Sequence, residues 1–252
     1  MNLDSPYGRL LADAAKVPTT GFALEDAVDL VVDAASSRFV WRGHAVVMPI
    51  GGRFNVENAL AAAGAAAAAG IDEATIAEGL SRPVRVPSRF EVVDLGQPFP
   101  VIIDYAHTPD GLEQVLRAVG DLGRGGDTIV VFGCGGDRDA SKRPAMGEVA
   151  ARYADRVILT ADNSRGEQTG AIIDAVREGY ASASGRRARD LVVEPDRRAA
   201  IALAVDGAGP GDVVVVAGKG HETTQTIGDT VTPFDDREVA ETELARRNGP
   251  AS

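Results

Sequence analysis

Hydrophobic residues follow a regular pattern in the second part of the chain. Short continuous runs of Val and Ile alternate there with longer stretches of helical periodicity. Continuous apolar runs are typical of strands buried on both faces, and their alternation with helices predicts a mostly parallel α/β sheet. The expected strands are "FEVVDL", "PVIIDY", "TIVVFG", "RVILTA", "DLVVEP" and "DVVVVAG". The expected helices lie near 109–120, 141–154, 168–180 and 196–206.

The first part of the chain has a different pattern. Alternation in "RFVWRGHAVVMPI" predicts strands joined by a turn at Arg42-Gly43. The run "NVENALAAAGAAAAAG" predicts a helix that ends at Gly70, and "DEATIAEGL" predicts another with Asp72 as its N-cap. Prolines and arginines in "SRPVRVPSR" indicate a linker. We therefore expect one domain over 1–87 and a second over 88–252.

Polar residues gather directly after four of the expected strands. The segments are "DYAHTPDGL", "GCGGDRDASKRP", "ADNSRGE" and "GKGHE". Ligands bind at the carboxyl ends of the strands in such sheets, so these segments are expected to form one site. They offer arginines, an amide and a carboxylate, which suit a small zwitterion. The residues expected to converge are Arg138, Asn163, Arg165, Gly218 and Glu222.

Two of these segments also allow simpler interpretations. Asp104 ends a strand, where its carboxylate can accept hydrogen bonds from ribose hydroxyls. Alternatively, Asp104 and His107 only form the turn before a helix, with Thr108 as its N-cap and Pro109 as its first residue. In the glycine-rich segment, Arg138 either binds a carboxylate or pairs with its acidic neighbours on a solvated surface.

The glycine-rich segments do not match the common nucleotide fingerprints. The glycines before Arg138 are expected to let backbone N–H groups approach a ligand closely. A nicotinamide fingerprint needs glycine where Arg138 stands, so dinucleotide binding has weak support. A phosphate loop needs Ser or Thr after its lysine, but Gly220 follows Lys219. Cys134 is expected to be a small loop residue and not a nucleophile.

Charge and composition exclude several classes of partner. The formal net charge of −11 argues against nucleic acid binding, which needs a clustered positive surface. The most apolar run, "ALAAAGAAAAAG", is too short to cross a bilayer, and the first residues do not resemble a signal peptide. The single cysteine fits a reducing compartment. We therefore expect a cytoplasmic protein with no nucleic acid or membrane partner.

Six motifs carry a resemblance to a known family. They are "GRFNVENALAA", "VPSRFEVV", "IIDYAHTPDGL", "VFGCGGDRDASKRPAMG", "TADNSRGE" and "AGKGHE". Together they closely resemble the Mur ligases, in the same order and spacing over nearly the whole chain. The resemblance implies that 1–87 is the end of the family's central ATPase domain. It also implies that 88–252 is the carboxyl-terminal domain, a Rossmann-like α/β fold.

The resemblance also implies an activity. Its nearest motifs are those of ligases that join meso-diaminopimelate to the UDP-N-acetylmuramoyl dipeptide, with ATP and Mg²⁺, through an acyl phosphate. The residues implied at the nucleotide are Asn55, Asn58, Arg89, Asp104 and His107. The residues implied at the diaminopimelate are Arg138, Asp162, Asn163, Ser164, Arg165, Gly218 and Glu222. No metal ligand is implied within this chain.

The sequence departs from the family pattern at three points. Ser88 stands where members usually have glycine, and Ser164 where they usually have proline, which is expected to loosen that loop. The sequence also contains no phosphate loop with Lys-Ser/Thr. We expect the catalytic residues and the UDP-binding domain upstream of Met1 or in a partner chain, so that this chain alone is inactive.

Two alternatives to a ligase remain at this point. One is a non-catalytic module that binds an amino acid or a nucleotide, which the lack of a phosphate loop favours for this chain in isolation. The other is a nicotinamide-dependent dehydrogenase, which rests on the fold class alone.

Overall fold

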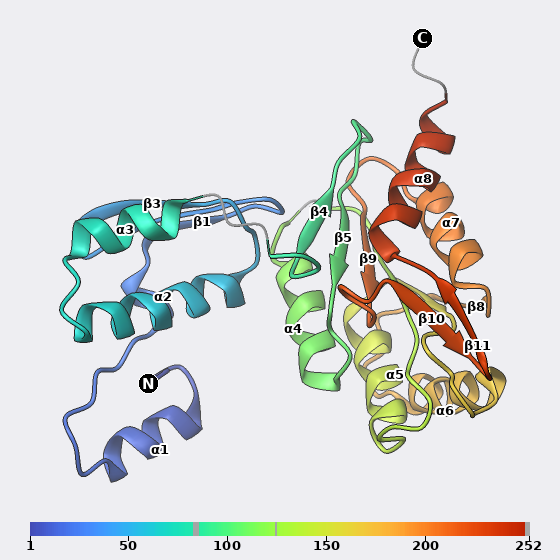
Figure 1. The fold of residues 1–252 in the computed structure, drawn as a ribbon, viewed down its shortest axis with the longest axis horizontal. Coiled ribbons are helices and arrows are strands. Elements are labelled where there is room, and N and C mark those ends of the chain that lie inside the picture. The colour runs from blue at the N-terminus through green and yellow to red at the C-terminus, as the bar shows by residue number, and fades with distance from the viewer. Residues whose placement is uncertain (83–85, 124, 250–252) are drawn as a thin grey trace. The chain divides into compact units, whose positions relative to one another are not determined.

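The computed structural model describes residues 1–82, 86–123 and 125–249. The chain divides into two compact units, Met1–Arg85 and Val86–Ser252 (Figure 1). Residues 83–85 of the expected linker lie outside the described residues. Among the described residues, no helix combines the length and the apolar character needed to cross a bilayer.

The first unit packs helices on a small antiparallel sheet. Its strands are β1 (Val28–Val32), β2 (Ser37–Trp41) and β3 (His44–Met48), in that order. Its helices are α1 (Pro6–Ala14), the short 3₁₀ helix η1 (Leu24–Asp26), α2 (Arg53–Ala68) and α3 (Glu73–Ser81). The core of this unit includes Phe39, Trp41 and Val46 from the sheet and Val56 and Leu60 from α2.

The expectations for the first unit are confirmed where the local signals are strong. Arg42 and Gly43 both have positive φ, 47° and 84°, as a tight turn between two strands requires. Asp72 caps α3 by accepting a hydrogen bond from Thr75 N at 2.9 Å. Gly70, with φ of 88°, follows the end of α2. The helix α1, in which no residue is buried, was not predicted.

The second unit is built on a six-stranded sheet. Its strands are β4 (Glu91–Val93), β5 (Val101–Asp104), β6 (Thr128–Phe132), β7 (Arg156–Leu159), β8 (Asp190–Val193) and β9 (Val213–Ala217). Its helices are α4 (Pro109–Gly120), α5 (Lys142–Tyr153), α6 (Thr169–Ser182), α7 (Arg197–Gly207) and α8 (Asp236–Asn248). A hairpin of β10 (Thr224–Ile227) and β11 (Thr230–Pro233) lies between β9 and α8 in the sequence.

The sheet is mostly parallel, as expected. Its strand order is β4-β5-β9-β6-β7-β8, and only the pairing of β4 with β5 is antiparallel. The strand of this sheet that comes last in the sequence, β9, therefore lies between β5 and β6. The expected helices are also confirmed, each within two residues of its predicted bounds. The sequence pattern did not predict the hairpin or α8.

Helices cover both faces of this sheet (Figure 1). The helices α7 and α8 pack on one face, where the core includes Ile103, Val131, Val214, Ile201 and Leu244. Strand residues alternate between faces, so neighbours such as Ile102, Val130 and Val215 point to the side of α4, α5 and α6. Because both faces are covered, the central strands are continuous apolar runs.

Candidate functional site

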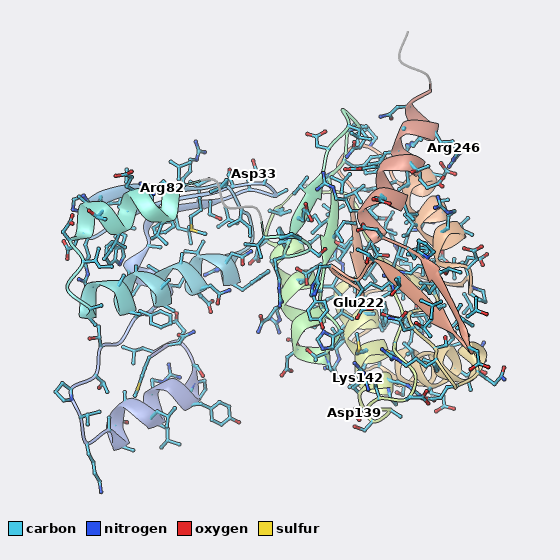
Figure 2. The ribbon with its side chains drawn as sticks, viewed as in Figure 1. Asp33, Arg82, Asp139, Lys142, Glu222 and Arg246 are labelled. Carbon is cyan, nitrogen blue, oxygen red and sulfur yellow. The ribbon has the colours of Figure 1, made fainter. Side chains whose placement is uncertain are left out.

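A cavity of about 400 Å³ lies at the carboxyl ends of β5, β6, β7 and β9. This volume falls in the range of small-molecule sites. The residues that line it are Tyr105, His107, Thr108, Gly135, Arg138, Asp139, Lys142, Asp162, Asn163, Arg165, Gly218 and Glu222. The expected convergence of Arg138, Asn163, Arg165, Gly218 and Glu222 on one cavity is therefore confirmed. Figure 2 labels three lining residues, Glu222, Lys142 and Asp139.

The order of the strands brings the four loops together. β5, β9, β6 and β7 are parallel neighbours, so the loops that follow them meet at one edge of the sheet. The loop after β6 packs against the loop after β7, where Gly136 N donates to Asn163 O at 2.8 Å. A Cβ atom at Gly136 would lie only 1.9 Å from Ser164 O. The lack of a side chain at Gly136 thus allows the two loops to pack closely. We had expected it to allow a ligand to approach the backbone.

Three carboxylates line the cavity; that of Asp139 is bonded to Ser141, and those of Asp162 and Glu222 lie beside Asn163. Asp162 is buried, and its Oδ1 accepts a hydrogen bond from Asn163 N at 2.5 Å. Glu222 Oε2 accepts from Asn163 Nδ2 at 2.5 Å. Gly218, with φ of 113°, lies against Asp162, because a Cβ atom there would be 2.9 Å from Asp162 Oδ2. Two carboxylates beside an open volume favour a ligand with an ammonium group.

The cavity also carries three cationic side chains. Arg165 Nη1 donates to Gly136 O at 2.8 Å, and Lys142 Nζ donates to His107 O at 2.6 Å. Within the described part of the chain, Arg138 and Arg165 form no ion pair, so Arg138 and the Nε and Nη2 groups of Arg165 are available to a ligand carboxylate. Guanidinium groups bind carboxylates through two parallel hydrogen bonds. The cavity therefore suits a molecule with both an ammonium group and a carboxylate.

Arg138 does not pair with its acidic neighbours, Asp137 and Asp139, as the alternative interpretation required. Asp137 Oδ2 accepts from Gly166 N at 2.9 Å. Asp139 Oδ1 accepts from both the backbone N and the hydroxyl of Ser141, and the hydroxyl bond lowers the pKa of Asp139 below its ordinary value. Both carboxylates thus hold loop backbone and leave Arg138 exposed.

Arg143 and Glu167 form an ion pair that is hydrogen-bonded to the backbone of the loop after β6. Arg143 Nη1 and Nη2 donate to the two carboxylate oxygens of Glu167 at 2.9 and 2.8 Å. Arg143 Nη2 also donates to Gly135 O, and Glu167 Oε1 accepts from Asp137 N at 2.6 Å. The bond to Arg143 holds the pKa of Glu167 below its ordinary value. This ion pair was not predicted from the sequence.

Ser164 does not line the cavity. Its side chain is buried, and Oγ lies 2.7 Å from Thr169 Oγ1 in the first turn of α6. Its carbonyl oxygen accepts from Glu167 N at 3.0 Å. These bonds fix the residue that we expected to loosen the loop. A ligand contact from the Ser164 side chain has no support in this geometry.

Ser88 adopts the backbone conformation that glycine prefers. Its φ is 55°, in the left-handed region where side chains are disfavoured. Two bonds hold it there: Ser88 N donates to Glu91 Oε2 at 2.8 Å, and Tyr105 N donates to Ser88 O at 2.9 Å. The bonds explain how serine is accommodated where relatives of the resembled family usually have glycine.

Among the residues implied at the nucleotide, Asp104 does not line the cavity. Asp104 is buried and lies outside the cavity lining, with its oxygens bonded to Phe90 N and Ala106 N at 2.8 Å each. Burial raises the pKa of Asp104, while the two backbone bonds oppose this shift. The geometry therefore favours the turn-forming role of Asp104. Its contact with a ribose stays a prediction.

His107 and Arg89 lie close to a tyrosine ring. His107 lines the cavity, is exposed, and has its ring centroid 4.5 Å from that of Tyr105. The guanidinium carbon of Arg89 lies 5.1 Å from the Tyr105 ring centroid. The helix that follows begins as predicted, with Thr108 Oγ1 accepting from Gly111 N at 3.1 Å.

Asn55 and Asn58 belong to the first unit, on α2. Asn55 Nδ2 donates to Gly51 O at 2.7 Å, and Asn58 is exposed. Their expected role at the adenine stays a prediction.

The described residues do not fit a resident metal centre. Within them, no group of three or more His, Cys, Asp or Glu side chains could hold a metal ion. Mg²⁺ prefers octahedral oxygen ligation and commonly takes ligands from substrate phosphates. Nothing in the geometry of this chain alone assigns the implied Mg²⁺ to protein ligands.

Comparison with known proteins gives a consistent family. A family description, "Mur ligase, glutamate ligase domain", matches residues 88–220. The chain is 43% identical to the UDP-N-acetylmuramoyl-L-alanyl-D-glutamate–2,6-diaminopimelate ligase of Streptomyces coelicolor, over 99% of this chain and 51% of the relative. It is 41% identical to the enzyme of that name from Geobacillus kaustophilus, over 98% and 51%. The chain thus spans about half the length of these relatives.

Solved structures agree with this result. A structure of a UDP-N-acetylmuramoyl-L-alanyl-D-glutamate–2,6-diaminopimelate ligase superposes with a TM-score of 0.65 at 33% identity, over 98% of this chain and 53% of that one. A UDP-N-acetylmuramate–alanine ligase from Thermotoga maritima shares the fold, with a TM-score of 0.60 at 18% identity over 95% and 49%. The family match covers more than half of the chain, and the solved relatives have the same fold: the chain belongs to the Mur ligase family.

Proposed function

We propose that this chain carries the amino-acid-binding part of an ATP-dependent ligase, which joins meso-diaminopimelate to UDP-N-acetylmuramoyl-L-alanyl-D-glutamate. The observation that carries the proposal is the cavity with Arg138 and Arg165 beside Glu222 and Asp162. Diaminopimelate has an ammonium group and a carboxylate at each end, and these groups complement the charges of that cavity. The proposed location is the cytoplasm.

In this proposal the chain positions the attacking amine. Glu222 and Asp162 bind the ammonium group at one end of the amino acid, and Arg138 and Arg165 bind carboxylates. The amine at the other end then faces the activated acyl carbon of the dipeptide. ATP, when bound, supplies the phosphoryl group that activates the carboxylate of the dipeptide. Orientation of the two reactants is itself a large part of such catalysis.

Calorimetric titration tests the ligand. We expect the chain to bind meso-diaminopimelate and to bind L-lysine at least about tenfold more weakly, because lysine leaves one arginine without its carboxylate. The matched control is Arg189→Ala. Arg189 is exposed and directly precedes β8, at the end of the strands opposite the cavity, so this variant should bind both amino acids as the unchanged chain does. Equal affinity for both amino acids would contradict the proposed specificity.

A non-catalytic binding module is the second candidate. It is favoured by one observation, that the sequence contains no glycine-rich phosphate loop with Lys-Ser/Thr. A ligation assay with the UDP-linked dipeptide, ATP, Mg²⁺ and diaminopimelate separates the two candidates. We expect the chain to bind the amino acid without turnover when no other polypeptide is added. Robust turnover by the chain alone would overturn that expectation.

A further inference from the structure

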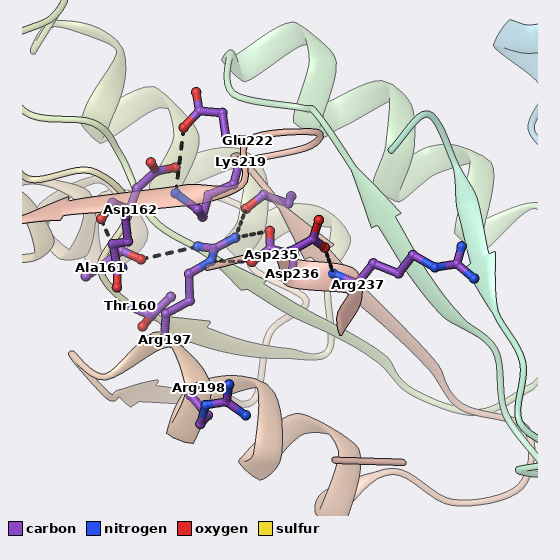
Figure 3. Close-up of polar contacts among 12 residues, drawn as sticks. Thr160, Ala161, Asp162, Arg197, Arg198, Lys219, Glu222, Asp235, Asp236 and Arg237 are labelled. Atoms are coloured by element: carbon purple, nitrogen blue, oxygen red, sulfur yellow. Dashed lines mark hydrogen bonds and ion pairs between the residues drawn. The ribbon is translucent and has the colours of Figure 1, made fainter. Parts of the chain in front are cut away.

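Lys219 is a buried cation directly behind the cavity, and it does not line it. Its side chain is 0% exposed, although lysine is among the residues most rarely buried. Lys219 Nζ donates to Thr224 O at 2.6 Å and to Asn163 Oδ1 at 3.3 Å, and it lies 3.6 Å from Glu222 Oε2. Figure 3 shows Lys219 between Glu222 and the Arg197–Asp236 pair.

Lys219, together with the backbone of Thr226, determines how the amide of Asn163 is oriented. Asn163 Oδ1 faces two donors, Lys219 Nζ and Thr226 N, the latter at 2.8 Å. An amide nitrogen in that position would face both donors with its own hydrogens, so the oxygen must occupy it. The Nδ2 group is consequently turned toward Glu222, to which it donates at 2.5 Å.

The amide of Asn163 and the ammonium of Lys219 then act on the same oxygen. Glu222 Oε2 accepts from Asn163 Nδ2 and lies in ion-pair distance of Lys219 Nζ. In the part of the chain that the structure describes, no donor is bound to Oε1 of this partly exposed carboxylate. One oxygen of Glu222 is thus held inward, and the other is left for a ligand in the cavity.

We propose that Lys219 is a positioning residue, which orients the Asn163 amide and thereby aims the Glu222 carboxylate at the ammonium group of an amino-acid ligand. The identity of that ligand rests on the proposed function. Lys219 touches no ligand itself. It acts from behind two residues that line the cavity.

The first test needs no ligand. The ¹⁵N spectrum of the unliganded chain contains the side-chain amide signal of Asn163, which is assigned by its loss in Asn163→Asp. The chemical shift of this signal should differ from those of solvent-exposed asparagines. The amide should also exchange with water at least about tenfold more slowly than they do, because it is hydrogen-bonded to a carboxylate. In Lys219→Met, this protection should fall. A freely exchanging Asn163 amide in the unchanged chain would overturn the proposal, even if the variant does not fold.

The second test is a double-mutant cycle on binding of meso-diaminopimelate, followed by calorimetry. Lys219→Met should weaken binding at least about tenfold, and Glu222→Gln should do so as well. If Lys219 acts through Glu222, the double variant should bind no more weakly than Glu222→Gln alone. A purely structural role would instead give losses that multiply.

The outcomes separate the two proposals. Unchanged binding in a folded Lys219→Met variant, or multiplicative losses in the cycle, would overturn the role of Lys219 and leave the proposed function intact. Failure of the unchanged chain to bind meso-diaminopimelate would overturn the proposed function and the ligand part of this inference. The ligand-free spectrum would still decide whether Lys219 orients the Asn163 amide.

Discussion

Arg197 and Asp236 form an ion pair from which water is fully excluded. Arg197 Nε and Nη2 donate to the two carboxylate oxygens of Asp236 at 2.7 Å each, and both side chains are 0% exposed. The same guanidinium donates to Ala217 O at 3.0 Å and to Ala161 O at 3.3 Å (Figure 3). One side chain thus ties α7 and α8 to the ends of β9 and β7, just before the residues that line the cavity.

Arg197→Met should destabilise the second unit strongly. It leaves the carboxylate of Asp236 buried without a partner, a loss that typically costs about 3–5 kcal/mol. The free energy of unfolding in urea measures this. The matched control is Arg177→Met, because the Arg177–Asp174 pair is exposed and such pairs contribute about 1 kcal/mol or less. Similar losses in both variants would show that burial of the Arg197 pair has no special effect.

Arg165→Ala should reduce the preference for meso-diaminopimelate over lysine. The guanidinium of Arg165 lines the cavity, and within the described residues it forms no ion pair and donates only from Nη1, to loop carbonyl oxygens, so Nε and Nη2 are left for a ligand carboxylate. A hydrogen bond to a charged group contributes about 1.5–3 kcal/mol. The affinities of both amino acids, measured by calorimetry, give the change. An unaltered ratio would contradict the assignment of Arg165 to the second carboxylate.

Gly136→Ala should separate the loops after β6 and β7. The added Cβ atom would lie 1.9 Å from Ser164 O and 2.7 Å from Ser164 C, which are backbone atoms, so the loop itself would have to move. We expect a loss of at least about 1 kcal/mol in the free energy of unfolding, together with weaker ligand binding. Gly170→Ala in α6 is the control, since no atom lies within 4 Å of its added Cβ. The control should be neutral or stabilising.

Cys134 should be unreactive in the folded chain. It is buried beside Met146, and burial raises the pKa of its thiol to about 11. The thiolate, which is the reactive form, is therefore scarce at neutral pH. Labelling with a maleimide should be slow in buffer and fast in urea. Equally rapid labelling of the folded chain would show that the loop opens more readily than its packing implies.

The stability of the second unit should depend on the protonation of Lys219. Burial lowers the pKa of Lys219 below its ordinary value of 10.5, although the carboxylates of Asp162 and Glu222 oppose the shift. Between the lowered value and 10.5, the unfolded chain holds more protons than the folded chain, so the free energy of unfolding rises with pH. Urea unfolding across this alkaline range should show the rise, and Lys219→Met should lack it. An identical pH dependence in both proteins would contradict the prediction.

The sequence predicts the parts of this fold that depend on local patterns. Continuous apolar runs located the parallel strands, and Thr108 and Asp72 located helix starts, because each signal lies within a few residues. The helix α8 was missed because its sequence is mostly charged, and its buried side is limited to residues such as Val239 and Leu244. The antiparallel pairing of β4 depends on contacts distant in the sequence.

The candidate site was predictable to a similar extent. Strand-end positions identified most residues that line the cavity, because parallel topology brings those positions together. The burial of Lys219 and its contact with Asn163 were not predictable, since they depend on how the loop after β9 folds back on the loop after β7. The same holds for Ser164, whose side chain turns to Thr169.

The central place of β9 has a consequence for how this unit is synthesised. Strand β9 joins β5 on one side to β6 on the other, yet it comes after all other strands of the sheet in the sequence. Until Val213–Ala217 has been synthesised, β5 and β6 lack the neighbour that joins them in the complete sheet. Unpaired strand edges readily pair with other chains, so a polypeptide that ends before β9 should aggregate more readily than the complete unit.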